Sequence, residues 1–376
     1  MDKKVLFTLK IGDGEIRACE SGNSAIDDEI YAEYKSAVLS FFSFYPADVV
    51  CERLKNLHIS FEIDGQMPDN TALEAAFLDL FEKNPDCAPN SLFRADTTDE
   101  YLERWIENLR KTAEETPIDA NVTGEWVEFD YGDKFYGRYR KVDKENPILL
   151  VSLPCYAADW NSLTPYLHLP CDILQLSPLG YNTPRGYDLS KRGTYGAWPV
   201  LFDTVLEVNE DAGYRKWALE CVMAINKMRR PNQKIAFLGT SQGGGMSLVM
   251  SSVMREITVA CAVEMPFLIG FSGKNYNKVK LFVGAQERSK MVTIYDFCAR
   301  EHLFAVDPMS HAKRLDMPTL IVSGELDDQC PKEDIFEFSE KLSCPKKYVE
   351  LAGAHHGYTA QFANLAAQWI LTNSGK

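Results

Sequence analysis

The sequence has no long hydrophobic run and no excess of positive charge. Its 376 residues include 54 acidic and 40 basic side chains, which gives a formal net charge of -14. Such a chain repels phosphate backbones and anionic lipid headgroups, so we expect neither a nucleic-acid partner nor a membrane partner. The N-terminal segment lacks the apolar core of an export signal, because Lys10 interrupts its apolar stretch, and we expect a cytoplasmic protein.

Patterns typical of metal sites and disulfides are also missing. The ten cysteines include no Cys-x-x-Cys pair, and the six histidines include no His-Glu-x-x-His spacing. Several cysteines lie inside apolar runs, as Cys261 does in Val-Ala-Cys-Ala-Val, which is typical of buried and reduced thiols. We therefore expect no metal and no other cofactor.

The pattern of the chain changes near residue 120. Residues 1–120 have apolar positions mostly at helical spacing, which predicts a helix-rich α+β region. The sequence leaves its role open between a lid, an interface and an accessory unit. From residue 121 to residue 376, strand-like and helix-like segments alternate. This alternation predicts an α/β domain with a mainly parallel central sheet and helices on both faces.

Hydrophobic periodicity and turn signals predict the individual elements. In the first region we expect strands at 4–10 and 58–63, and helices at 26–42, from residue 70, and from a cap at Thr97 or Thr98 through 109. In the second region we expect strands at 126–131, 135–142, 148–153, 172–176, 235–238, 259–264, 319–323 and 348–351, and helices at 214–228, 246–254 and 362–371.

A serine lies at a tight predicted turn of the second region. Gly239-Thr240-Ser241-Gln242-Gly243 matches Gly-x-Ser-x-Gly, directly after an apolar strand and before an apolar helix. In this context the motif forms a strained turn that projects the serine hydroxyl above the sheet. A phosphate-binding loop is the alternative, but the Lys-Ser/Thr ending of such a loop is missing. We therefore predict that Ser241 is a nucleophile.

An acid and a histidine follow the serine in the order that this chemistry requires. Asp327 and Asp328 both lie in the loop after the predicted strand 319–323. His355 and His356 both follow the next predicted strand, whereas the other four histidines precede the serine or the acid. The order of the residues thus leaves Asp327 or Asp328 as the acid and His355 or His356 as the base.

Backbone N–H groups at two places are expected to hold an oxyanion. Gln242 follows the nucleophile, and Tyr156 lies in the loop after an early strand, which are the usual sources of such donors. Trp160, Tyr195 and Phe267 are candidate side chains for a substrate pocket, with ordinary packing as the alternative for each.

Together these segments resemble the acetyl xylan esterase and cephalosporin-C deacetylase family of α/β-hydrolase serine esterases. Gly-Thr-Ser-Gln-Gly-Gly at 239–244 is similar to the nucleophile motif of the family, and Val-Glu-Met-Pro-Phe-Leu at 263–268 resembles its Pro-Phe-Leu segment. Asp-Asp-Gln-Cys-Pro at 327–331 looks like the acid loop, in which the catalytic Asp stands three residues before Cys-Pro. The resemblance therefore selects Asp327.

The same resemblance favours one of the two histidines. Ala354-His355-His356 stands where the family has Gly-His-Glu, which favours His355 as the base. Pro154-Cys155-Tyr156 resembles the Gly-Tyr oxyanion segment of the family. The Arg-Gly-Gln motif of the family has no counterpart, since Ser-Pro-Leu-Gly stands in its place at 177–180.

The resemblance implies an α/β-hydrolase fold and a serine carboxylic-ester hydrolase. Such an enzyme removes small, acetyl-type acyl groups from acetylated carbohydrate or related small esters through a Ser-His-Asp triad. Its partner is a small-molecule or oligosaccharide ester, and a homo-oligomer is compatible with it. Two alternatives are another serine hydrolase on the same fold, such as an aminopeptidase, thioesterase or longer-chain esterase, and a non-catalytic binding relative.

Overall fold

The computed structural model describes residues 5–11, 14–20, 59–63, 97–142, 147–155, 164–177, 182–187, 199–206, 212–276, 278–279 and 296–374. The helices expected at 26–42 and from residue 70 lie outside these residues. The chain divides into two compact units, one formed by residues 1–96 and 287–297 and the other by residues 97–286 and 298–376.

In the first unit, the described elements are strands. β1 (Val5–Ile11), β2 (Gly14–Glu20) and β3 (Ile59–Ile63) form an antiparallel sheet in the order β1-β2-β3. The strands predicted at 4–10 and 58–63 are confirmed. β2 was not predicted, although Ile16 and Ala18 alternate with charged residues as in a half-buried strand.

The second unit is built on a nine-stranded sheet in the order β14-β13-β12-β11-β7-β8-β6-β5-β4. The strands from β14 to β8 are parallel, and β6, β5 and β4 continue the sheet as antiparallel neighbours. The mainly parallel sheet predicted from the sequence is therefore confirmed. The strands are β4 (Asp119–Thr123), β5 (Trp126–Asp130), β6 (Lys134–Arg140), β7 (Ile148–Leu153), β8 (Asp172–Leu176), β11 (Lys234–Thr240), β12 (Thr258–Glu264), β13 (Thr319–Gly324) and β14 (Lys346–Leu351). A separate pair, β9 (Asn182–Thr183) and β10 (Gly186–Tyr187), is antiparallel.

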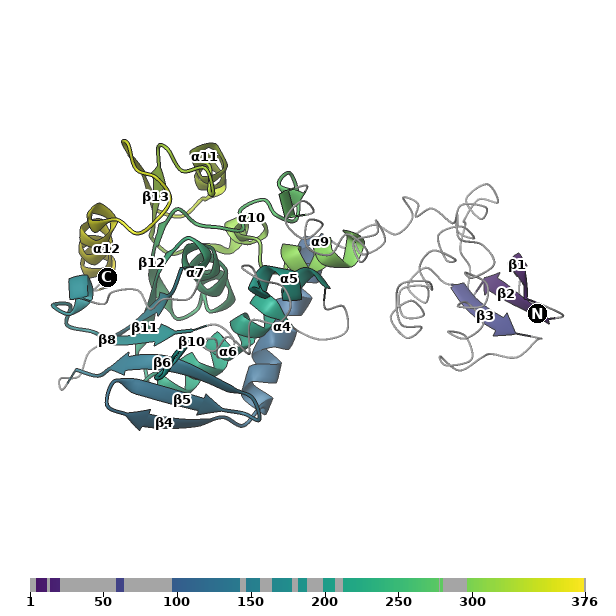
Figure 1. Cartoon of the computed structure of the whole chain (residues 1–376), viewed down its shortest axis with the longest axis horizontal. Helices are drawn as coiled ribbons and strands as arrows, with labels where there is room; N and C mark the ends of the chain where they lie inside the picture. Colours follow the sequence, from purple (N-terminus) through teal and green to yellow (C-terminus); the bar gives the residue numbers. More distant parts are fainter. Residues whose placement is uncertain are drawn as a thin grey trace. The chain divides into compact units, whose positions relative to one another are not determined.

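Helices cover both faces of this sheet (Figure 1). α7 contacts β7, β11 and β12 on one face, with α6 beside it, and α12 contacts β12 and β13 on the other. The helices are α4 (Asp99–Glu115), α5 (Pro199–Leu206), α6 (Gly213–Met228), α7 (Gln242–Val253), α9 (Asp296–Phe304), α10 (Pro308–His311), α11 (Lys332–Lys341) and α12 (Ala360–Asn373), with 3-10 turns at Thr164–Tyr166 and Ala312–Arg314. Among the described residues, no helix is long and apolar enough to span a membrane.

The hydrophobic core follows from the alternation of side chains along the central strands. All six residues of β7 are buried, as expected for a strand covered on both faces. On one face, Leu150 and Leu238 pack with Phe362 and Ala366 of α12 in a single buried cluster. The central strands are therefore held rigidly, and the loops that follow them are placed by a packed scaffold.

The helix α4 belongs to the second unit, although the sequence places it before the boundary at residue 120. Thr98 caps it by accepting a hydrogen bond from the N–H of Tyr101 at 3.2 Å. Its apolar side, which includes Trp105 and Ile106, is buried. The expected boundary is thus corrected to residue 97, because helical spacing reveals an apolar face but not the surface against which it packs.

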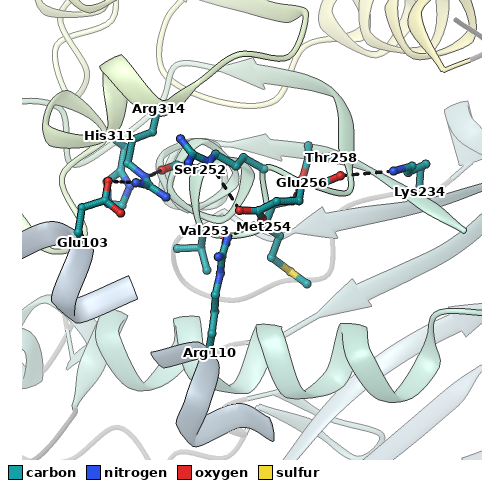
Figure 2. Close-up of polar contacts among 11 residues, drawn as sticks. Glu103, Arg110, Lys234, Ser252, Val253, Met254, Glu256, Thr258, His311 and Arg314 are labelled. Atoms are coloured by element: carbon teal, nitrogen blue, oxygen red, sulfur yellow. Dashed lines mark hydrogen bonds and ion pairs between the residues drawn. The ribbon is translucent and has the colours of Figure 1, made fainter. Parts of the chain in front are cut away.

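Polar contacts fasten α4 to the end of α7 (Figure 2). Arg110 donates through Nε to the carbonyl of Val253, the last residue of α7, at 2.8 Å and forms an ion pair with Glu256 at 2.6 Å. Glu103 pairs with Arg314, whose Nε donates to the Ser252 hydroxyl at 3.1 Å. A guanidinium at this point satisfies a carbonyl that the helix leaves unpaired and complements the helix dipole.

Candidate active site

The candidate site lies at the carboxyl ends of the parallel strands. Ser241 follows β11 directly, Asp327 lies in the loop after β13, and His356 lies in the loop after β14. Parallel strands bring their carboxyl ends to one edge of the sheet, where open α/β sheets bind their ligands. Residues from distant parts of the sequence therefore meet at this edge.

Ser241 occupies a strained turn between β11 and α7. Its backbone angles are φ 55° and ψ -121°, in a region that costs a non-glycine residue about 1–3 kcal/mol. Two hydrogen bonds hold it there: its N–H donates to the carbonyl of Glu264 at 2.9 Å, and its carbonyl accepts from the N–H of Phe267 at 2.9 Å. The last residue of β12 and the segment after this strand thus fix both ends of Ser241.

The glycines around the serine are required by close backbone contacts. A Cβ atom at Gly239 would lie 2.1 Å from the carbonyl oxygen of Gly243. A Cβ atom at Gly243 would lie 2.0 Å from the carbonyl oxygen of Leu153, at the end of β7. The Gly-x-Ser-x-Gly spacing therefore reflects how tightly the first turn of α7 packs against two neighbouring strands.

A continuous chain of hydrogen bonds joins the serine, a histidine and an aspartate. Ser241 Oγ lies 2.8 Å from His356 Nε2, and His356 Nδ1 lies 2.9 Å from Asp327 Oδ2. The tautomer that satisfies both contacts carries its proton on Nδ1, so the serine hydroxyl donates to Nε2. This arrangement activates a nucleophile: the hydroxyl is hydrogen-bonded to a base, and a carboxylate orients the base.

Asp327 is held by its own loop. Its side chain is fully buried, and Oδ1 accepts hydrogen bonds from the N–H groups of Gln329 and Cys330, each at 2.9 Å. Asp328 is exposed, and its carboxylate accepts from the side chain of Gln329 at 3.4 Å. Of the two aspartates that the sequence offered, the structure brings Asp327 to the histidine.

The preference for His355 is corrected, because it is His356 that contacts Ser241 and Asp327. His355 is exposed. Of the two neighbouring side chains, that of His356 reaches the carboxylate of Asp327. The match to Gly-His-Glu of the family pointed to His355, because a short motif does not show whether the loop is shifted by one residue.

Of the two expected oxyanion donors, one lies among the described residues. Gln242 is the first residue of α7, and no described residue accepts a hydrogen bond from its backbone N–H. Its side chain is held by the hydroxyl of Tyr214, which donates to Oε1 at 3.1 Å. Tyr156 lies outside the described residues. An N–H at a helix N-terminus beside the nucleophile, with no acceptor among the described residues, is a suitable donor to developing negative charge.

A cavity of about 210 Å³ opens beside the serine. Its described walls are Cys155, Thr240, Ser241, Phe267, Gln329, His356, Gly357 and Tyr358. Phe267, which the sequence offered as a pocket residue, therefore lines it, whereas Trp160 and Tyr195 lie outside the described residues. Tyr358 and Gln329 were missed, although Tyr358 stands two residues after His356 and Gln329 two residues after Asp327.

A buried acid beside the site was also missed. Glu264 ends the apolar strand β12 and is fully buried, and burial raises the pKa of its carboxyl to about 7. An acidic residue at the end of the apolar run Val-Ala-Cys-Ala-Val was the signal that could have revealed it.

Three side chains of types that bind metals meet around Asp327. Ligand atoms of Asp327, Cys330 and His356 lie within 4.8 Å of one another. The carboxylate is already occupied by the backbone donors of its loop and by the histidine. Burial and the Asp327 charge raise the pKa of the Cys330 thiol well above its usual value, which disfavours the thiolate that a metal would need. The donor set therefore fits a hydrogen-bonded carboxylate rather than a cation site.

The sheet topology, the strained serine turn and the order Ser, Asp, His define an α/β-hydrolase. Residues 207–373 match the family model described as acetyl xylan esterase (AXE1), so the resemblance drawn from the motifs is confirmed, and the match indicates a carboxylic ester hydrolase. No curated protein matches the chain.

Two of the solved structures that share this fold are acetyl xylan esterases. Acetyl xylan esterase 1 from Thermoanaerobacterium sp. JW/SL YS485 superposes with a TM-score of 0.58 at 18% identity, covering 74% of this chain and 94% of that one. The acetyl xylan esterase from Paenibacillus sp. R4 superposes with a TM-score of 0.60 at 18% identity, covering 76% of this chain and 97% of that one.

Proposed function

We propose that the chain is a serine esterase that removes small, acetyl-type acyl groups, with Ser241 as nucleophile, His356 as base and Asp327 as the acid that orients the base. The observation that carries the proposal is the pair of contacts at His356, 2.8 Å to Ser241 Oγ and 2.9 Å to Asp327 Oδ2. These distances are within the reach that proton transfer requires.

The reaction is a two-step acyl transfer. His356 takes the proton of Ser241 as the oxygen attacks the ester carbonyl, and Asp327 stabilises the imidazolium that forms. The N–H of Gln242 donates to the oxyanion of the tetrahedral intermediate. His356 then protonates the leaving alcohol as the C–O bond breaks. Water deprotonated by His356 attacks the acyl-enzyme, which releases the acid and restores the serine.

Two observations support a small acyl group. The cavity of about 210 Å³ beside Ser241 is bounded by the rings of Phe267 and Tyr358. The family model that matches residues 207–373 is that of acetyl xylan esterase, which supports acetylated carbohydrate as the substrate class. Since binding pockets for drug-sized ligands are about 300 Å³ or more, the described space suits a short acyl chain.

The experiment is the reaction of the whole protein with a fluorophosphonate probe and with p-nitrophenyl esters of increasing chain length. We expect covalent labelling at Ser241, hydrolysis fastest for acetate, and loss of both in Ser241→Ala. Ser251→Ala is the matched control, because Ser251 is buried in the same helix and bonds to the carbonyl of Ser247 instead. Labelling that survives in Ser241→Ala would overturn the nucleophile. A preference for long acyl chains or for an aminoacyl anilide would overturn the substrate class.

A further inference from the structure

Glu264 contacts both of the segments that carry the proposed nucleophile and base. Its backbone carbonyl accepts the N–H of Ser241 at 2.9 Å. Its carboxylate accepts the hydroxyl of Thr240 at 3.0 Å and the N–H of Thr359 at 3.1 Å, and the Thr359 hydroxyl also donates to it. A single acidic residue therefore gathers donors from the end of β11 and from the loop after His356.

Thr359 makes this contact relevant to the position of the histidine. It lies three residues after His356 and caps α12, because its hydroxyl oxygen accepts the N–H of Phe362 at 3.1 Å. Gly357 and Tyr358 also hold this loop, through Met265 Sδ at 3.4 Å and the Tyr166 hydroxyl at 3.1 Å. Thr359 is the residue that joins the loop to the packed helix α12, and its contacts with Glu264 tie that junction to β12. Thr240, the other partner of the carboxylate, is covalently joined to Ser241.

The charge of Glu264 is costly where it lies. The residue is fully buried, and among the described residues no Lys or Arg forms an ion pair with it. A carboxylate removed from water without a cation is destabilising unless hydrogen bonds compensate for it. Here the compensating donors all come from Thr240 and Thr359. The buried charge is therefore stabilised only when these two residues lie together on the carboxylate.

We infer that Glu264 is a positioning residue, which sets the distance between Ser241 and His356 by holding Thr240 and Thr359 on one buried carboxylate. This inference rests on the proposed esterase function. Glu264 forms no hydrogen bond with His356, so it takes no part in proton transfer; its hydrogen bonds hold the two threonines, and its interaction with the His356 ring is electrostatic only.

The test compares Glu264→Gln and Glu264→Ala with a control carboxylate. Asp172 is the control: it is also fully buried and accepts several donors, including Arg230 at 2.8 Å, but it begins β8 and so lies at the opposite edge of the sheet. For each variant, kcat and KM for p-nitrophenyl acetate, the rate of fluorophosphonate labelling and the melting temperature are measured.

We expect Glu264→Gln to lower kcat by about tenfold, because a neutral amide accepts the donors more weakly. Glu264→Ala should lower kcat by about 100-fold, since small misplacements of reacting groups have effects of that size. KM should stay nearly constant, and the labelling rate should fall in parallel with kcat. Asp172→Asn should lower the melting temperature and leave kcat unchanged.

A coupling measurement keeps the inference testable if Glu264→Ala fails to fold. Thr359→Val removes the hydroxyl and keeps the shape, so its effect on kcat should not add to that of Glu264→Gln. Full additivity, or wild-type kcat in both Glu264 variants together with a lowered melting temperature, would overturn the inference. Neither of these outcomes contradicts the proposed esterase function. That function would be refuted separately, by wild-type protein that is not labelled at Ser241 and does not cleave the ester.

Discussion

The Nε2 atom of His356 lies 2.8 Å from Oγ of Ser241, although the two residues are 115 positions apart in the sequence. His355, the neighbour of His356, is exposed. One position in the loop after β14 therefore separates a proposed catalytic base from a surface residue.

Replacement of each histidine should show this separation directly. We expect His356→Ala to lose at least about 1,000-fold in kcat for p-nitrophenyl acetate, because removing a member of such a triad removes base catalysis. His355→Ala should stay within about twofold of wild type, as expected for an exposed side chain remote from the reaction. The reverse result would restore the assignment made from the sequence.

The close contact at Gly243 predicts a strong effect of one methyl group. A Cβ atom there would lie 2.0 Å from the carbonyl oxygen of Leu153, so Gly243→Ala must push α7 away from β7. We expect a loss of stability of about 1–3 kcal/mol and a marked fall in kcat, since Ser241 and the N–H of Gln242 lie on the displaced turn. Gly273→Ala is the control, because a Cβ atom there would lie 3.9 Å from its nearest neighbour, the carbonyl oxygen of Gly270. Equal stability of the two variants by chemical denaturation would contradict this account.

Tyr358 should limit the size of the acyl or alcohol group that the cavity accepts. It lines the cavity, and its hydroxyl lies 3.1 Å from that of Tyr166. We expect Tyr358→Ala to enlarge the cavity and raise kcat/KM for p-nitrophenyl hexanoate relative to acetate by about tenfold, which is the range of discrimination in apolar pockets. Tyr358→Phe keeps the ring and should keep the preference of the wild type. An unchanged ratio in Tyr358→Ala would show that the described cavity does not receive the substrate.

His311 should make the stability of the protein depend on acidity. The ring is fully buried, with Nδ1 2.8 Å from the Ser252 hydroxyl and Nε2 2.9 Å from the Ala305 carbonyl, and burial lowers its pKa from 6.5 to about 4. Because the folded state disfavours the protonated ring, this stabilisation is complete above pH 6.5 and is lost as the pH falls toward 4.

Between pH 6.5 and pH 4, the protein loses at most about 3 kcal/mol of its free energy of unfolding through the protonation of His311. This loss can be measured as the free energy of unfolding of wild type and His311→Gln at pH 7 and pH 4.5. The difference between the two proteins should shrink or reverse at the lower pH. Parallel curves for the two proteins would contradict the assignment of this effect to His311.

Much of the fold could be predicted because its signals are local. The strand at 148–153 is a run of buried apolar residues, and the pattern of such a run does not depend on its neighbours. The prediction failed for elements that form only through contacts with other parts of the chain. The helix predicted from residue 246 begins at Gln242, because three glycines in its first turn mask a helix that close packing requires. β4 was missed because its exposed sequence carries no apolar alternation, and pairing with β5 creates the strand.

By itself, the sequence determined the central strands of the sheet, the serine turn and the acid loop, since each depends on residues within a few positions of one another. Only the tertiary structure decided which histidine enters the site, to which unit α4 belongs and what Glu264 holds. These three answers depend on the direction of side chains across segments far apart in the chain, which periodicity and motif spacing do not encode. The contact between Glu264 and Thr359 joins residues 95 positions apart and exists only once β12 and α12 have packed.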